Sequence, residues 1–247
     1  MLSPKLYKLA VVLFIFIFIS CSEEIDEDTG IENAPPAYEV NILPLGDSRV
    51  QGNRPNHESY RFELWKNFIG NDWTVDFLGP NTDDSEYPQF LGLDFDKNHA
   101  GSGGYTTSLI LTDLENTLEN VETPDIILLG IGGVDLIRDN SYEGAILNIH
   151  EIINILQEHN PDITIFIEQI APAKSDIYTD EDIVLFNGFN NNIMIVAQER
   201  TTADSNVVSI DMTEGWDDIL LADDLHYNEL GAKFIADKYF DAIDEEM

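Results

Sequence analysis

Short apolar runs alternate with longer stretches of helical periodicity from residue 38 to the end of the chain. Regular alternation of this kind predicts right-handed crossovers and a parallel sheet covered by helices on both faces. We therefore expect an α/β fold in which residues 38–247 form a single three-layer α/β/α domain with a mainly parallel, five-stranded sheet. The predicted strands are 40–45, 74–78, 126–131, 163–170 and 207–210, and the predicted helices lie near 60–68, 107–118, 145–159, 183–199 and 229–243.

The first 20 residues have the pattern of an export signal. Lys5 and Lys8 precede 11 consecutive apolar residues, 9–19, which is shorter than the ~20 needed to span a bilayer. Residues 18–21, Phe-Ile-Ser-Cys, resemble a bacterial lipobox, and this resemblance implies cleavage before Cys21 and acylation of the new N-terminus. An ordinary secretory signal followed by an incidental cysteine is the alternative. Cys21 is the only cysteine in the chain, so an intrachain disulfide is excluded.

Residues 21–37 are polar and acidic and lack apolar periodicity, which predicts a flexible tether. The acids directly after Cys21 resemble sorting signals for a bacterial outer membrane. We therefore expect an exported protein that is anchored through lipid on Cys21, at either the periplasmic or the cell-surface face.

The formal net charge of the chain is −35. A field of this sign repels nucleic acid and anionic lipid headgroups, so neither is an expected partner. The acids are spread along the whole domain, which is typical of a solvated surface and says little about the substrate.

A serine follows the first predicted strand, and an Asp-x-x-His lies near the C-terminus. Because ligands of open parallel sheets bind beyond the carboxyl ends of the strands, Ser48 is well placed to react. A serine nucleophile needs a histidine base and a carboxylate that orients the base, and Asp223 and His226 supply both types. A second such pair, Asp96 and His99, precedes a glycine block, and there we expect His99 in a loop that lines the pocket or caps a turn.

The glycine block 101–104 could supply backbone N–H groups to a developing oxyanion, although a simple turn would explain the same residues. No dinucleotide fingerprint, phosphate-binding loop or complete calcium loop occurs in the sequence. The Gly-x-Ser-x-Gly elbow of the α/β-hydrolases is also absent, because Ser48 lies in Gly-Asp-Ser-Arg-Val.

Four blocks in register resemble the SGNH (GDSL) hydrolase family, and within it the carbohydrate esterase branch that includes acetylxylan esterases. The blocks are 43–48, 75–79, 99–107 and 223–226. The resemblance implies that Ser48 is the nucleophile, His226 the base and Asp223 the orienting carboxylate. It further implies that the N–H groups of Ser48 and Gly104 are oxyanion donors, and that neither a metal nor an organic cofactor is needed.

The sequence departs from that family at one functional position. The family's third block reads Gly-x-Asn-Asp, with the Asn side chain as a third oxyanion donor, whereas residues 132–135 here read Gly-Gly-Val-Asp. Val134 has no side-chain donor, and loss of one such donor typically costs about 10²- to 10³-fold in turnover. The amides considered as replacements are those of Asn53, Asn98 and Gln169.

We therefore expect an esterase that removes small acyl groups, above all acetyl, from a carbohydrate. One alternative is a surface lipoprotein that binds carbohydrate and has lost efficient catalysis, because of Val134. Another is a lipase or thioesterase of the same fold. Four aromatic residues are candidates for a sugar site, although core packing is the more common fate of such side chains: Tyr60, Trp65, Trp73 and Trp216.

Overall fold

The computed structural model describes residues 39–139 and 141–247. The expected signal peptide 1–20, the lipidation site Cys21 and the expected tether 21–37 lie outside the described residues.

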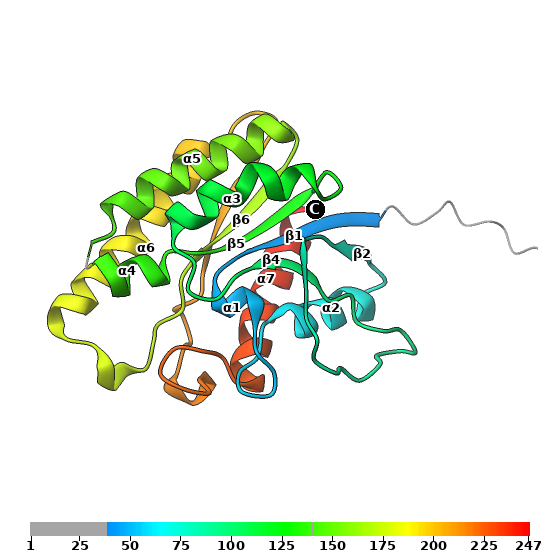
Figure 1. Cartoon of the computed structure of the whole chain (residues 1–247), viewed down its shortest axis with the longest axis horizontal. Coiled ribbons are helices and arrows are strands. Elements are labelled where there is room, and N and C mark those ends of the chain that lie inside the picture. The colour runs from blue at the N-terminus through cyan, green and yellow to red at the C-terminus, as the bar shows by residue number, and fades with distance from the viewer. Residues whose placement is uncertain (1–38, 140) are drawn as a thin grey trace, which may run out of the picture. The chain divides into compact units, whose positions relative to one another are not determined.

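A central, mostly parallel sheet forms the middle layer of the domain (Figure 1). Its order is β3-β4-β1-β5-β6-β7, and β2 pairs with the first half of β1 on the same side as β4. Among the paired strands of residues 39–139 and 141–247, only β3 and β4 are antiparallel to each other. The five predicted strands are all present: β1 (Glu39–Gly46), β2 (Thr74–Phe77), β5 (Ile126–Gly130), β6 (Thr164–Gln169) and β7 (Val207–Asp211).

The expected number of five strands is wrong, since the sheet has seven. The two additional strands are β3 (Asn81–Thr82) and β4 (Asn98–Gly101). Neither contains an apolar run, so hydrophobic patterning cannot reveal them. Backbone pairing places β4 in the sheet, because its Ala100 and Gly101 pair with Leu45 and Gly46 at the carboxyl end of β1.

Helices cover both faces of the sheet (Figure 1). On one face lie α3 (Thr107–Glu119), α5 (Glu143–His159) and α6 (Asp180–Arg200), and on the other α2 (Arg61–Gly70) and α7 (Glu229–Glu246). These are the five predicted helices. Short segments add α1 (Ser48–Gln51), α4 (Gly133–Asp139) and the 3₁₀ turns η1 (Ser175–Ile177) and η2 (Asp218–Leu220).

Two hydrophobic cores, one on each side of the sheet, explain the three layers. In β1, Leu43 and Leu45 pack into the core beneath α3, α5 and α6, whereas Val40 and Ile42 pack into the core beneath α2 and α7. Successive side chains of a strand point to opposite faces, so a strand that is apolar throughout must be covered on both. The carboxyl ends of these buried strands are thereby held at one edge of the sheet.

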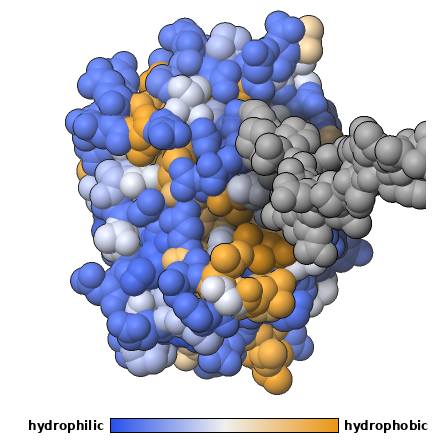
Figure 2. Space-filling model, turned by 90° about the vertical axis from the view of Figure 1, so that its right-hand side faces the viewer, coloured by the Kyte–Doolittle hydropathy of each residue, from blue (hydrophilic) through white to orange (hydrophobic). Residues whose placement is uncertain are grey.

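The face of the molecule shown in Figure 2 is mostly hydrophilic, with a larger apolar patch below the centre of the view and smaller apolar areas elsewhere. In the described residues, no helix combines the length and the apolar character that crossing a membrane requires.

Candidate active site

Ser48 lies at the carboxyl end of β1, as the first residue of α1. The preceding Gly46 is tightly enclosed, since a side-chain carbon there would lie 2.1 Å from the carbonyl oxygen of Gly130 in β5. Buried Asp47 then caps α1 by accepting a hydrogen bond from the Arg49 N–H at 2.9 Å. The turn from strand to helix is therefore fixed on both sides of Ser48.

The structure brings the three candidate catalytic side chains together, although they are as much as 178 positions apart in the sequence. His226 Nε2 lies 3.0 Å from Ser48 Oγ. On the other side of the ring, His226 Nδ1 lies 2.8 Å from Asp223 Oδ2. This geometry suits proton transfer from the hydroxyl to the ring, with the carboxylate selecting the tautomer that leaves Nε2 free to accept.

Asp223 is held in its charged form. Partial burial acts to raise the pKa of its carboxyl, but the N–H groups of Leu225 and His226 donate to Oδ1 at 2.8 and 2.7 Å, and the His226 ring adds to their effect. Together they lower the pKa to about 2. The carboxylate thus remains ionised over the whole pH range in which a histidine base works.

Arg49 ties the serine segment to the histidine loop. Its Nε donates to the carbonyl of Leu225 at 2.9 Å, and its Nη1 donates to the carbonyl of Ala171 at 2.6 Å. The guanidinium also lies over the ring of Tyr227, 5.0 Å from its centroid. Because Leu225 and Tyr227 flank His226, the side chain next to Ser48 fixes the loop that presents the base.

A second histidine packs on His226. The His57 ring is stacked on it at a centroid distance of 4.0 Å and an interplanar angle of 17°. Burial lowers the pKa of His57, and the neighbouring His226 lowers it further. His57 therefore acts as a neutral, flat wall that limits movement of the His226 ring.

The glycine block lies beside the serine, as the oxyanion prediction requires. The Ser102 N–H donates to the Gly46 carbonyl at 3.0 Å, and the Gly103 N–H donates to Oε1 of Gln51 at 2.7 Å. Gly104 has a φ of +76°, a conformation that favours glycine. Within residues 39–139 and 141–247, the N–H groups of Ser48 and Gly104 donate to no protein acceptor, which leaves both available to a substrate.

Buried Asp135, in the segment 132–135, holds the residues that follow the glycine block. Its carboxylate accepts from the Thr107 N–H at 3.0 Å and from the Thr107 hydroxyl at 2.7 Å, at the start of α3. Val134, the preceding residue, lines the pocket next to Ser48. Within the described residues, no amide of Asn53, Asn98 or Gln169 lines this pocket, so none replaces the missing donor there.

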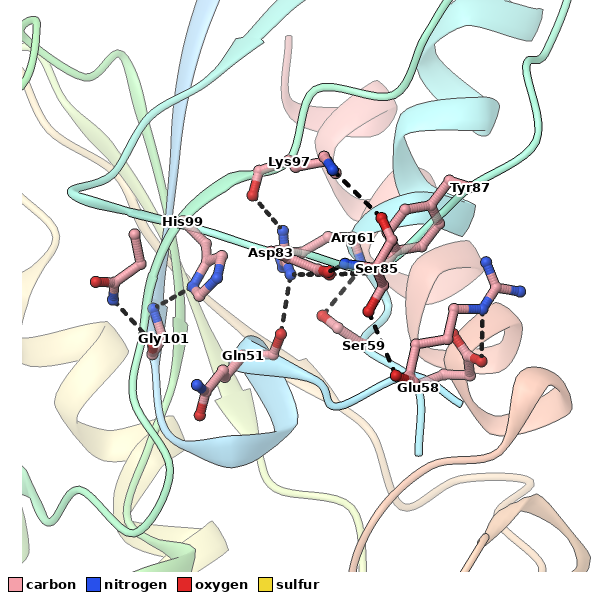
Figure 3. Close-up of polar contacts among 12 residues, drawn as sticks. Gln51, Glu58, Ser59, Arg61, Asp83, Ser85, Tyr87, Lys97, His99 and Gly101 are labelled. Atoms are coloured by element: carbon pink, nitrogen blue, oxygen red, sulfur yellow. Dashed lines mark hydrogen bonds and ion pairs between the residues drawn. The ribbon is translucent and has the colours of Figure 1, made fainter. Parts of the chain in front are cut away.

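His99 does not lie in a loop at the site, contrary to expectation. It is in β4, only 2% exposed, and its Nδ1 accepts from the Gly101 N–H at 3.0 Å (Figure 3). Burial, followed by the nearby Arg61, lowers its pKa to about 3, so it is a neutral structural residue. An Asp-x-x-His spacing alone could not distinguish it from His226, because strand pairing determines which of the two is buried.

Arg61 forms a buried support beneath the nucleophile helix (Figure 3). Its guanidinium donates to the Gln51 carbonyl at 2.9 Å, to the Lys97 carbonyl at 3.0 Å and to Asp83 Oδ2 at 3.3 Å. A further bond at 2.9 Å reaches the Val50 carbonyl. The last turn of α1 is thereby fixed to α2, to the loop that carries Asp83 and to the segment that enters β4.

A pocket of about 470 Å³ opens directly at Ser48 and His226. Its walls come from α4, the segment after β6, η1 and the first half of α6. The four aromatic candidates for a sugar site do not line it: Tyr60 and Trp65 are buried in the core under α2 and α7, and Trp73 and Trp216 pack against that core. Among the described residues, no group of three or more His, Cys, Asp or Glu side chains could hold a metal ion.

The family of the chain is established by comparison of its sequence with known families. The GDSL-like lipase/acylhydrolase family matches residues 45–234, which include Ser48, Val134 and His226. The chain belongs to this family. It is therefore a carboxylic ester hydrolase of the SGNH type, and the expected recognition and fold class are confirmed.

Solved structures give the same fold. A family 3 carbohydrate esterase from Clostridium thermocellum is 26% identical, with a TM-score of 0.67 over 84% of this chain and 96% of that chain. A family 3 carbohydrate esterase from Talaromyces cellulolyticus is 24% identical, with a TM-score of 0.71 over 84% and 97%. An acetyl esterase mutant determined with an acetate ion is 23% identical, with a TM-score of 0.72 over 84% and 97%. No curated protein sequence matches the chain.

Sequence reasoning did not find Arg49, Gln51, His57 or Arg61 at this GDSL-like site. Arg49 and Gln51 are close to Ser48 in sequence, and this closeness was the one available signal. All four side chains contact either segments that are distant in sequence or backbone groups. A residue pattern therefore cannot predict that they belong to the site.

Proposed function

We propose that this hydrolase uses Ser48 as its nucleophile, His226 as its base and Asp223 as the orienting carboxylate to remove acyl groups, acetyl among them, from a carbohydrate. The observation that carries the proposal is the continuous chain of contacts from Ser48 Oγ to His226 at 3.0 Å and on to Asp223 at 2.8 Å. No other part of the proposal has equal weight.

The reaction follows from these contacts. As Ser48 Oγ attacks the ester carbonyl, its proton passes to His226 Nε2, and the resulting imidazolium is stabilised by Asp223. The protonated ring then gives this proton to the leaving alkoxide, which departs as the alcohol and leaves an acyl-enzyme. Water, deprotonated by the same ring, hydrolyses the acyl-enzyme and frees Ser48. The N–H groups of Ser48 and Gly104 are the proposed donors to the oxyanion.

The test of the nucleophile is hydrolysis of p-nitrophenyl acetate by the purified full chain. We expect Ser48→Ala to reduce turnover by at least about 10³-fold and to abolish covalent labelling by a fluorophosphonate probe. Ser108→Ala, at an exposed serine of α3, is the matched control and should retain both. Full activity of Ser48→Ala would reject the assignment.

The support for a carbohydrate substrate and for an acetyl group comes from the solved structures that share this fold. Two are carbohydrate esterases and one is an acetyl esterase that was determined with acetate. We expect the full chain to release acetate from an acetylated polysaccharide, measured directly as free acetate. If the chain hydrolyses p-nitrophenyl acetate but releases no acetate from any acetylated glycan, the esterase activity stands and the carbohydrate substrate is rejected.

One observation favours the second candidate, a carbohydrate-binding lipoprotein with impaired catalysis. Val134 lines the pocket where the family has an amide donor. This candidate predicts glycan binding without fluorophosphonate labelling of Ser48. The short contacts among Ser48, His226 and Asp223 favour the enzyme instead, since a binding protein has no need to preserve them.

We also propose that the chain is exported and anchored to a bacterial outer membrane through lipid on Cys21. The supporting features are the apolar run 9–19 and the lipobox-like residues 18–21. Metabolic labelling with an alkyne fatty acid should mark the wild-type chain, and Cys21→Ser should be unlabelled and leave the membrane fraction. Equal labelling of both would reject the anchor.

A further inference from the structure

We propose that the pocket beside Ser48 is a binding site for the acyl chain of the ester, shaped for neutral esters whose acyl chains are longer than acetyl. The inference rests on the proposed function and names the acyl group that the site accepts beyond acetyl. It is carried by the walls of the pocket, by their exposure and by the arrangement of the charged groups around it.

The walls of the pocket are predominantly apolar. They extend from the serine along α4, the segment after β6, η1 and the start of α6. The apolar side chains that line it include Val134, Ile137, Ile170, Ile177, Leu185 and Phe186. A sugar ring, with a hydroxyl on nearly every carbon, would leave most of its hydrogen-bonding groups unpaired against such walls.

The size of the pocket also exceeds what acetyl needs. Its volume is about 470 Å³, whereas the three heavy atoms of an acetyl group need room for about three water molecules, at roughly 30 Å³ each. A pocket of this size in contact with the nucleophile has space for a longer chain after the ester carbonyl is in place.

Two of the lining side chains are exposed despite being apolar. Ile137 of α4 is 64% exposed and Ile177 of η1 is 45% exposed, and both lie on the same pocket. Apolar side chains that cluster on a surface otherwise rich in acids are typical of a binding site. An acyl chain between α4 and η1 would cover both.

Val134 makes the apolar wall continuous with the reacting centre. It is partly buried and lines the same pocket as Ser48, so an amide at this position would add polar atoms to a wall that is otherwise apolar. The residue that weakens the oxyanion site therefore also extends the apolar surface as far as Ser48.

The acids that line the pocket are engaged by their own neighbours. Asp47 accepts from the Arg49 N–H, Glu168 accepts from the Tyr239 hydroxyl at 2.7 Å, and Asp182 accepts from the Thr179 hydroxyl at 2.7 Å. Exposed Asp224 lies 3.8 Å from Lys174. Because the chain carries a net charge of −35, it repels anionic esters, so a neutral alcohol is the expected leaving group.

The test is a series of p-nitrophenyl esters with acyl chains of 2, 4, 6, 8 and 10 carbons, each used below its aggregation limit with the full chain. Burial of one methylene group corresponds to roughly three- to fourfold in binding. We expect kcat/KM to rise by about this factor for each methylene group added beyond acetate, until the chain no longer fits the pocket, and then to level off or fall.

Two variants place the effect in this pocket. Ile137→Asp and Ile177→Asp each put a charge on its wall at an exposed position, so neither disturbs a core. Each should lower the ratio of kcat/KM for the eight-carbon ester to that for acetate by at least about tenfold. The matched control is Leu147→Asp on α5, which is 71% exposed and does not line the pocket, and it should leave the ratio unchanged.

The outcomes separate this inference from the proposed function. If acetate is the best substrate and the ratio is the same in all three variants, the acyl-chain site is rejected while the esterase stands. If no ester of any length is hydrolysed and Ser48 resists fluorophosphonate labelling, the proposed function fails, and this inference fails with it.

Discussion

At the scale of single residues, Val134 occupies a position where the resemblance to SGNH hydrolases leads us to expect an asparagine. The structure places it beside Ser48, while the other parts of the expected site, Gly104 and the Asp223–His226 pair, are in position to act. In the site that we propose, Val134 therefore leaves one oxyanion donor unsupplied, while Ser48 lies within hydrogen-bonding distance of His226, and His226 within that of Asp223.

We expect Val134→Asn to raise kcat for p-nitrophenyl acetate by about 10- to 10³-fold, because an amide there would donate to the developing oxyanion. Val134→Leu is the matched control, since it changes the shape of the side chain without adding a donor, and it should give no gain. Steady-state kinetics of the two variants decide the matter. An equal rate for wild type and Val134→Asn would show that the missing donor is not what limits turnover.

At the scale of elements, short α1 depends on side chains from elsewhere. It has only four residues, so it cannot be stable on its own. Arg61 of α2 binds the carbonyls of Val50 and Gln51 at its end, and Asp83 binds Arg61 in turn (Figure 3). Ser48, the proposed nucleophile, is thus positioned by a buried charge on the neighbouring helix.

We expect Arg61→Met to lower the free energy of unfolding by about 3 to 5 kcal/mol, because it removes the guanidinium that binds Asp83 and three carbonyls. The double variant Arg61→Met/Asp83→Asn should recover part of this loss, since no buried charge remains unpaired. Urea unfolding measures both. Lys66→Met, which removes a half-exposed ion pair with Glu63 on the same helix, should cost less than about 1 kcal/mol. A similar small loss for Arg61→Met would contradict the supporting role.

At the scale of the whole molecule, stability depends on acids that folding removes from water. Glu168 of β6 is only 3% exposed, at the wall of the pocket, and burial raises its pKa to about 7, above the 4.5 of an exposed glutamate. The folded protein therefore binds the proton more tightly than the unfolded chain. Linkage then requires this contribution to stability to be complete below pH 4.5 and lost as pH rises to 7.

We expect Glu168→Gln to leave stability nearly unchanged at pH 5 and to raise it relative to wild type at pH 8, by up to about 3 kcal/mol. The amide oxygen can still accept from Tyr239, so the hydrogen bond is retained. Urea unfolding at the two pH values gives the difference, and Glu151→Gln at an exposed position of α5 should show none. A difference for Glu168→Gln that does not change with pH would contradict the shifted pKa.

The sequence by itself determined the layers and most of the elements. Apolar strands such as 40–45 and 126–131 can be buried only on both faces, and amphipathic helices such as 145–159 must cover them, so the α/β sandwich follows from patterning alone. The four motif blocks likewise indicated Ser48, Asp223 and His226 before any geometry was known.

Only the tertiary structure decided which side chains meet. It separated His226 from His99, since one has its Nε2 at the nucleophile and the other is buried in a strand that has no apolar pattern. It also revealed Arg49, His57 and Arg61, and the apolar pocket that Val134 joins to Ser48. The physical reason is that periodicity records whether a residue faces water or the core, whereas a site is built from contacts between segments whose separation along the chain carries no such signal.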